Sequence, residues 1–243
     1  MMFEPKMIKV PGGTYTLGVP SIGADSGLQH VWLSPRVTQS IAFLIGETAV
    51  TVKEFKAFLL DTKGVLDGDY ECYNTMDETL PAGVIAWDDA AEYARWLKEK
   101  TGKPYRMPTA AEWEIAARGG LEGKKFPWGD ESPAGRCDYA ESADSKPLLP
   151  KPVKSYEPNG YGLYDMVGNM WCWCSDLWVD YVKHDPPLNT PTNKPAESNT
   201  ILRGGSYLTT IVENLWCAYI HEDPTDLRHA CLGMRVACDV TEE

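Results

Sequence analysis

The chain has 243 residues, of which 43% are hydrophobic, and a net charge of −12 at pH 7. A chain of this length can bury a large core, and we expect a single globular domain spanning residues 1–243. The negative charge opposes binding to phosphate backbones, so nucleic acid is not an expected partner.

The N-terminal segment is predicted to form a hairpin. Met1 to Val10 lacks the apolar run of a secretory signal, so no signal peptide is expected. Two alternating segments flank Pro11-Gly12-Gly13, a pattern typical of two short strands joined by a tight turn. No later segment approaches the roughly 20 apolar residues of a membrane helix, so membrane insertion is not expected.

Two helices are predicted in the first half of the chain. Thr51 to Glu54 form a capping box, and apolar residues follow at helical spacing as far as Lys63-Gly64. A second helix is predicted to begin at a cap provided by Asp88 or Asp89 and to end before Gly102.

A third helix is predicted from a second capping box, Thr109 to Glu112, to Gly119-Gly120. From Leu121 onward the helical period disappears, and short segments joined by Gly, Pro and Asn turns predict strands. Pro186 to Asn199 has no apolar face and is predicted to be a surface loop. These elements indicate an α+β fold.

The cysteines do not form a recognisable metal or disulfide framework. Their number is odd, and none of them makes a CxxC pair. Cys172-Trp173-Cys174 would place two thiols on one face of a strand, where core packing is favoured over a metal or redox role. The seven are Cys72, Cys137, Cys172, Cys174, Cys217, Cys231 and Cys238.

Several motifs, taken together, resemble the formylglycine-generating-enzyme/sulfatase-modifying-factor family, a variant of the C-type lectin fold. The resemblance spans nearly the whole chain and implies an α+β fold with few helices and short irregular strands. It also implies that the final Val236-Ala237-Cys238 strand joins the initial hairpin in a small sheet. The motifs are Pro11-Gly12-Gly13, Val84 to Ala90, Tyr105 to Glu114, Ala116 to Gly120, Pro127 to Asp130, Pro158 to Trp171, Leu202 to Tyr207 and Leu232 to Ala237.

The resemblance implies that the oxidases of this family use two cysteines of the C-terminal segment to bind copper. Cys217 resembles the second of the pair, but Val212 stands five residues earlier, where the first is expected. One thiolate cannot provide the two-coordinate soft site that Cu(I) favours. We therefore expect a non-catalytic protein.

The resemblance also implies a calcium site. Its ligands would be Asp165, the carbonyl groups of Gly168 and Met170, and a carboxylate two positions later. Cys172 stands at that last position, and a thiol is a poor ligand for a hard cation. Calcium is therefore left open, and no cofactor is required.

The C-terminal segment has two patterned ends, here called the frame, and an aperiodic middle from Leu208 to Cys231, here called the filling. Leu202 to Tyr207 and Leu232 to Ala237 read as strands, whereas Leu208 to Cys231 follows neither a period of two nor one of 3.6. The same fold serves in the variable proteins of diversity-generating retroelements, whose adenine-directed mutagenesis rewrites this region. The runs Leu208 to Thr210 and Leu227 to Cys231 contain residue types that mutated asparagine codons encode.

The preferred hypothesis is a ligand-binding protein whose residues 203–237 form a hypervariable surface. Its partner would be a protein or another surface ligand of unknown identity, and the protein would be cytoplasmic or virion-associated. The alternative is a formylglycine-generating-enzyme-like oxidoreductase with an altered or lost copper site. The residues expected to contact ligand are Tyr207, Leu208, Thr209, Thr210, Trp216, Tyr219, Ile220, His221, Asp223, Leu227, Arg228, His229, Ala230 and Cys231.

Overall fold

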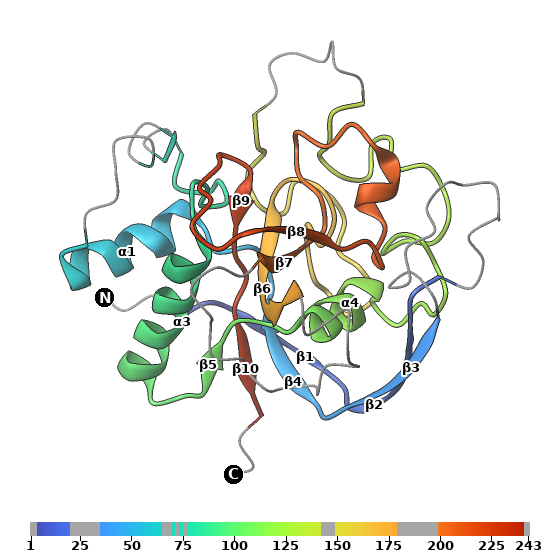
Figure 1. Cartoon of the computed structure of the whole chain (residues 1–243), viewed down its shortest axis with the longest axis horizontal. Coiled ribbons are helices and arrows are strands. Elements are labelled where there is room, and N and C mark those ends of the chain that lie inside the picture. Colours follow the sequence, from blue (N-terminus) through green and yellow to red (C-terminus); the bar gives the residue numbers. More distant parts are fainter. Residues whose placement is uncertain are drawn as a thin grey trace.

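The computed structural model describes residues 4–19, 35–64, 70, 73–74, 77–141, 149–178 and 199–240. Four strands come first, and helices and short strands are interspersed along the rest of these ranges (Figure 1). The elements are β1 (Met7–Val10), β2 (Gly13–Leu17), β3 (Arg36–Ser40), β4 (Phe43–Gly46), α1 (Val52–Thr62), α3 (Trp87–Thr101), β5 (Tyr105–Arg106), α4 (Ala110–Arg118), β6 (Trp171–Leu177), β7 (Asn199–Arg203), the 3₁₀ helix η2 (Val212–Leu215), β8 (His221–Pro224), β9 (Leu232–Gly233) and β10 (Ala237–Asp239).

The first four strands form one bent antiparallel ribbon. β1 pairs with β4 and β2 pairs with β3, in a register that stays constant across the bend. The predicted hairpin between β1 and β2 is therefore wrong. Pro11-Gly12 bends the ribbon but does not reverse the chain, and a Cβ on Gly12 would lie 2.8 Å from the backbone nitrogen of Ala42. Glycine is needed there because the opposite strand passes so close.

Both predicted capping boxes are present. The Thr51 hydroxyl accepts from the backbone N–H of Glu54, whose carboxylate accepts in turn from the Thr51 N–H. Thr109 and Glu112 make the same reciprocal pair at the start of α4. Each box satisfies two backbone donors that a helix N-terminus leaves without partners.

The start of α3 differs from the prediction. The N-cap is Ala86, and Asp89 is the third residue of the helix, where its carboxylate accepts from the Ala86 N–H at 2.8 Å. Asp88 lies in the first turn and is not the cap. The C-terminal prediction is confirmed, because Gly102 ends the helix in the left-handed conformation at φ 72°.

Two four-stranded sheets organise the molecule. One has the order β1-β4-β10-β5, so the first and last strands share a sheet with β4 between them. The other has the order β8-β7-β6-β9, with β9 parallel to β6. Figure 1 shows β10 on one side of the molecule, with β8, β9 and η2 on the opposite side.

Helix α4 packs in the core against β2 and against β6 and β7. All nine of its residues are buried, including the polar Glu112, Glu114 and Arg118. Trp113 and Trp173 are among the largest fully buried side chains. This burial fixes the base on which the C-terminal segment lies.

Some predictions lie outside the described residues. Cys72 and the expected surface loop, apart from Asn199 at the start of β7, belong to this group. None of the helices in the described ranges has both the length and the apolar character needed to cross a bilayer.

Candidate functional site

The C-terminal segment begins at a buried ion network. Arg203, at the end of β7, is fully buried and its Nη2 lies 2.6 Å from Glu114 Oε2. Arg118 binds the other carboxylate oxygen, also at 2.6 Å. Burial alone would raise the pKa of Glu114, but the two guanidinium groups outweigh it and hold that pKa below its usual range.

The same arginine also binds the backbone in the middle of the filling. Arg203 Nη1 donates to the carbonyl oxygens of Ala218 and Tyr219, at 2.9 and 2.6 Å. The network therefore fixes the backbone of the segment at two separate points.

The segment ends at a second buried arginine. Arg235 donates to the carbonyl oxygens of Gly46 and Tyr164, both at 2.6 Å. Just before it, β9 pairs with the start of β6, with Leu232 opposite Trp171. Both ends of the segment are thus anchored in the core.

Trp171 contacts two parts of the filling, Cys231 and the stretch from Tyr219 to His221. Its backbone N–H donates to the carbonyl oxygen of Cys231 at 3.0 Å, and its ring stacks on His221 with centroids 5.3 Å apart. The Tyr219 ring lies 6.3 Å away. Nearby, the Tyr207 N–H donates to the carbonyl oxygen of Asn169 at 3.1 Å. Cys231, Tyr219 and His221 therefore lie beside the start of β6.

Much of the filling is exposed to solvent. Thr210 and His229 are exposed, as are the apolar side chains of Leu227 (37%) and Ile211 (56%). Six further predicted residues are half-buried: Leu208, Tyr219, His221, Asp223, Arg228 and Ala230. Ile211 was not among the predicted contacts, although it lies in the aperiodic stretch that the sequence marks. We call these ten residues the C-terminal surface.

Five predicted contact residues are buried instead, so the prediction that they display their side chains is wrong. They are Tyr207, Thr209, Trp216, Ile220 and Cys231, each at most 9% exposed. Apolar residues without a regular period can still be buried in irregular backbone, because each loop residue orients its side chain independently.

Specific contacts explain two of these burials. The Thr209 hydroxyl accepts from the Ser206 N–H at 2.9 Å, so this threonine closes the turn after β7. Trp216 packs in the core, with Lys125 Nζ 5.0 Å from its ring centroid. The Thr209 turn and the Trp216 ring are therefore buried parts of the segment that position its exposed residues.

Arg228 connects the C-terminal surface to α3. Its guanidinium pairs with Asp89, the same carboxylate that accepts from the Ala86 N–H. Next to it, His229 Nδ1 lies 3.0 Å from Cys231 Sγ. Burial raises the pKa of the Cys231 thiol to about 11, so this cysteine is protonated near neutral pH.

Cys217 lies in the core and not at a surface. It is fully buried, and its N–H donates to the carbonyl oxygen of Lys125 at 2.7 Å. Burial raises the pKa of its thiol to about 12. Across the described part of the chain, no three His, Cys, Asp or Glu side chains converge as a metal site.

The residues implied for calcium do not fit that ion well. The carbonyl oxygen of Gly168 already accepts from the Met170 N–H at 2.7 Å. Burial raises the pKa of the Cys172 thiol to about 11, which leaves a neutral sulfur where an oxygen ligand is needed. The function proposed below does not depend on calcium.

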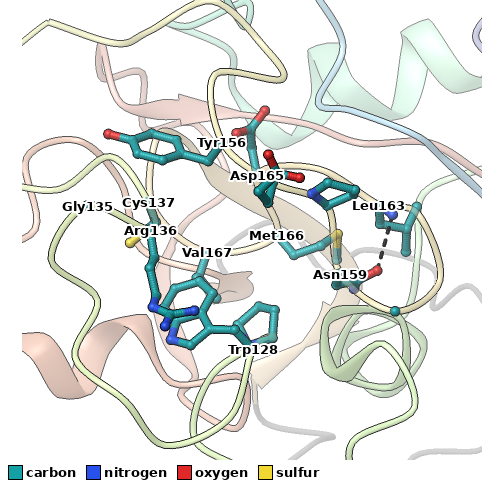
Figure 2. A pocket seen from close by; sticks show the side chains of 14 residues that line it. Trp128, Gly135, Arg136, Cys137, Tyr156, Asn159, Leu163, Asp165, Met166 and Val167 are labelled. Atoms are coloured by element: carbon teal, nitrogen blue, oxygen red, sulfur yellow. Dashed lines mark hydrogen bonds between the residues drawn. The ribbon is translucent and has the colours of Figure 1, made fainter.

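A separate cavity of about 310 Å³ lies outside the C-terminal segment (Figure 2). Its walls come from residues 127–137 and 156–167, which include two of the motifs quoted above. Asn159 stabilises one wall, because its side-chain oxygen accepts from the Leu163 N–H at 3.1 Å.

Comparisons with known proteins agree with this architecture. The formylglycine-generating enzyme of Streptomyces coelicolor is 44% identical over 138 residues, which cover 53% of this chain and 42% of that protein. The enzyme of the same name from Thermomonospora curvata is 30% identical over 262 residues, covering 83% of this chain and 82% of the relative. The chain thus spans less than half of the first relative but most of the second.

The solved structure of Treponema denticola variable protein 1 has a similar fold. Its TM-score is 0.75 at 23% sequence identity, with 96% of this chain and 95% of that chain covered. The family model described as "Sulfatase-modifying factor enzyme 1-like domain" matches residues 2–240. The chain therefore belongs to the sulfatase-modifying factor enzyme 1-like family and has its α+β fold.

Proposed function

We propose that this chain is a non-catalytic binding protein whose residues 203–237 carry a ligand-binding surface diversified by a retroelement. One observation carries the proposal: Arg203 and Arg235 anchor the segment in the core, while Thr210, Ile211 and Leu227 between them are exposed. A fixed frame around exposed side chains is what a surface needs if its sequence is to change without unfolding the protein.

Recognition would depend on a few anchors over a rigid base. Ile211 and Leu227 offer exposed apolar area, and Tyr219 and His221 offer amphipathic rings supported by Trp171. Aromatic and apolar anchors of this kind contribute most of the energy at protein interfaces. The partner is therefore proposed to be a protein or another surface ligand.

The state of the cysteines supports a non-catalytic role. Cys217 is fully buried, so it is not accessible to a substrate thiol. The likeness to Treponema denticola variable protein 1 bears on the fold alone, and the argument for binding rests on the C-terminal surface.

Two tests address the diversified surface. In the genome, an imperfect copy of the 3′ end of this gene should lie beside a reverse transcriptase gene, with differences confined to adenines. In the laboratory, a library randomised at Thr210, Ile211, Leu227 and His229 should remain mostly folded. A control library randomised at Thr209, Trp216 and Ile220 should mostly unfold. Equal losses in the two libraries would contradict the proposal.

The alternative is an oxidoreductase of the formylglycine-generating type, and the 44% identity to such an enzyme favours it. It predicts stoichiometric, tight Cu(I) binding that Cys217→Ser abolishes. Our proposal predicts no such binding in either the parent chain or the variant. Copper titration followed by absorbance therefore separates the two functions.

A further inference from the structure

The cavity in Figure 2 is lined by residues that lie outside the C-terminal segment. None of its lining residues belongs to residues 203–237. Its volume of about 310 Å³ is at the lower end of the range for small-molecule sites. Any ligand would therefore be small and would bind independently of the C-terminal surface.

One end of the cavity carries a carboxylate group, that of Asp165. Figure 2 shows Asp165 and Tyr156 together at this end, and Glu157 also lines the wall. Asp165 is held in place by the Lys154 N–H, which donates to Oδ2 at 2.8 Å.

The opposite end is cationic and aromatic. The Arg136 guanidinium carbon lies 6.0 Å from the Trp128 ring centroid, and Figure 2 shows the two side chains together. Trp128 is itself fixed, because it stacks on Phe126 with centroids 5.2 Å apart and planes 7° from parallel. Within the described ranges no carboxylate pairs with Arg136, so its guanidinium can receive an anion.

Between the two ends the walls are apolar. Leu163, Met166, Val167 and Cys137 are buried and line the cavity. A ligand that fits all three parts carries opposite charges at its ends and a short hydrocarbon between them.

We infer that this cavity binds a small zwitterion, an amino acid or a short ω-amino acid, with its ammonium at Asp165 and its carboxylate at Arg136. Charge-assisted hydrogen bonds to both groups would orient the ligand, and the planar guanidinium suits a carboxylate. The apolar middle section would exclude water from the methylene groups.

Calorimetric titration of the full chain tests this assignment. The probes are glycine, 4-aminobutanoate and 6-aminohexanoate, each at concentrations up to about 10 mM. Two matched control compounds each lack one charge of 4-aminobutanoate. Butylamine lacks the carboxylate, and butanoate lacks the ammonium. We expect saturable binding of at least one zwitterion, and binding about tenfold or more weaker for its singly charged analogues.

Two variants assign the ends. Asp165→Asn keeps the shape and suits the positive φ of 52°, which asparagine tolerates well, and it should remove the preference for the ammonium. Arg136→Gln alters an exposed side chain and should remove the preference for the carboxylate. Arg95→Gln, on the exposed face of α3, is the matched control and should bind like the parent.

The outcomes are decisive in either direction. The assignment is overturned if no zwitterion binds, if butylamine or butanoate binds as tightly as 4-aminobutanoate, or if Arg136→Gln binds unchanged. Binding of calcium alone at this cavity would also overturn it. Serine substitutions at Thr210, Leu227 and His229 should leave zwitterion binding intact, which keeps this test separate from that of the C-terminal surface.

Discussion

Replacing Glu114 by glutamine should destabilise the protein strongly. Its carboxylate accepts from the Gly18 N–H at 2.8 Å and from the guanidinium groups of Arg118 and Arg203. The glutamine amide is neutral and has only one acceptor oxygen. Its NH₂ group would face a guanidinium, and both groups are hydrogen-bond donors. Arg203 would keep its charge at full burial without a counterion.

The expected loss is about 3–5 kcal/mol, the usual cost of removing one partner from a buried ion pair. For a domain of this size, each kcal/mol lowers Tm by about 2–4 °C, so Tm should fall by roughly 6–20 °C. Thermal unfolding and urea titration of the parent and Glu114→Gln measure the change. The control is Glu92→Gln on α3, whose 63% exposed side chain pairs with Arg95 and should change stability by less than about 1 kcal/mol.

The pH dependence of the same pair provides a second check. Because the folded-state pKa of Glu114 is lowered, its ionisation stabilises the fold above the unfolded-state pKa. That stabilisation is lost as pH falls through the folded-state pKa. The difference in stability between parent and Glu114→Gln should therefore shrink in acid. A loss below about 1 kcal/mol at pH 7, or a difference that does not depend on pH, would refute the reasoning.

Three further predictions concern other parts of the molecule. Trp171→Ala should cost about 3–5 kcal/mol in urea unfolding, because the ring is buried beneath the C-terminal surface; a loss under 1 kcal/mol would place it outside the core. Asp176 is buried and its pKa is raised to about 6, so its contribution to stability should decline as pH rises from 4 to 7. Asp176→Asn should remove that decline, and an unchanged pH profile would contradict the burial argument. Single serine substitutions at Thr210, Leu227 and His229 should each change stability by about 0.5 kcal/mol or less, as measured by chemical denaturation.

Local signals predicted the helices well and the strand pairing less well. The capping boxes at Thr51 and Thr109 depend on residues three positions apart, so the sequence displays them directly. The N-cap of α3 was missed because Ala86 has no capping side chain, and only the Asp89 half of the reciprocal pair is visible. Pro11-Gly12-Gly13 is compatible with either a turn or a bend, and the partner strand β4 decides between them.

The C-terminal surface was predicted as a region but not residue by residue. Absence of period marked residues 208–231 as irregular, yet it could not separate the exposed Thr210 from its buried neighbour Thr209. The difference arises from one hydrogen bond to the Ser206 N–H. Contacts of this kind depend on the folded backbone and have no counterpart in composition or spacing.

The position of Cys172 has a consequence for how long the C-terminal segment can be. This residue pairs with Arg203 on one side and with Gly233 on the other, so the segment leaves and returns two strand spacings apart, roughly 10 Å. With its ends held this close, the segment is a closed loop, and the entropy of closing a flexible loop grows only with the logarithm of its length. Doubling such a loop costs about 0.6 kcal/mol, far less than total stability. Insertions at exposed positions such as Thr210 and Leu227 should therefore be tolerated, whereas deletions that remove the buried Trp216 or Ile220 should not.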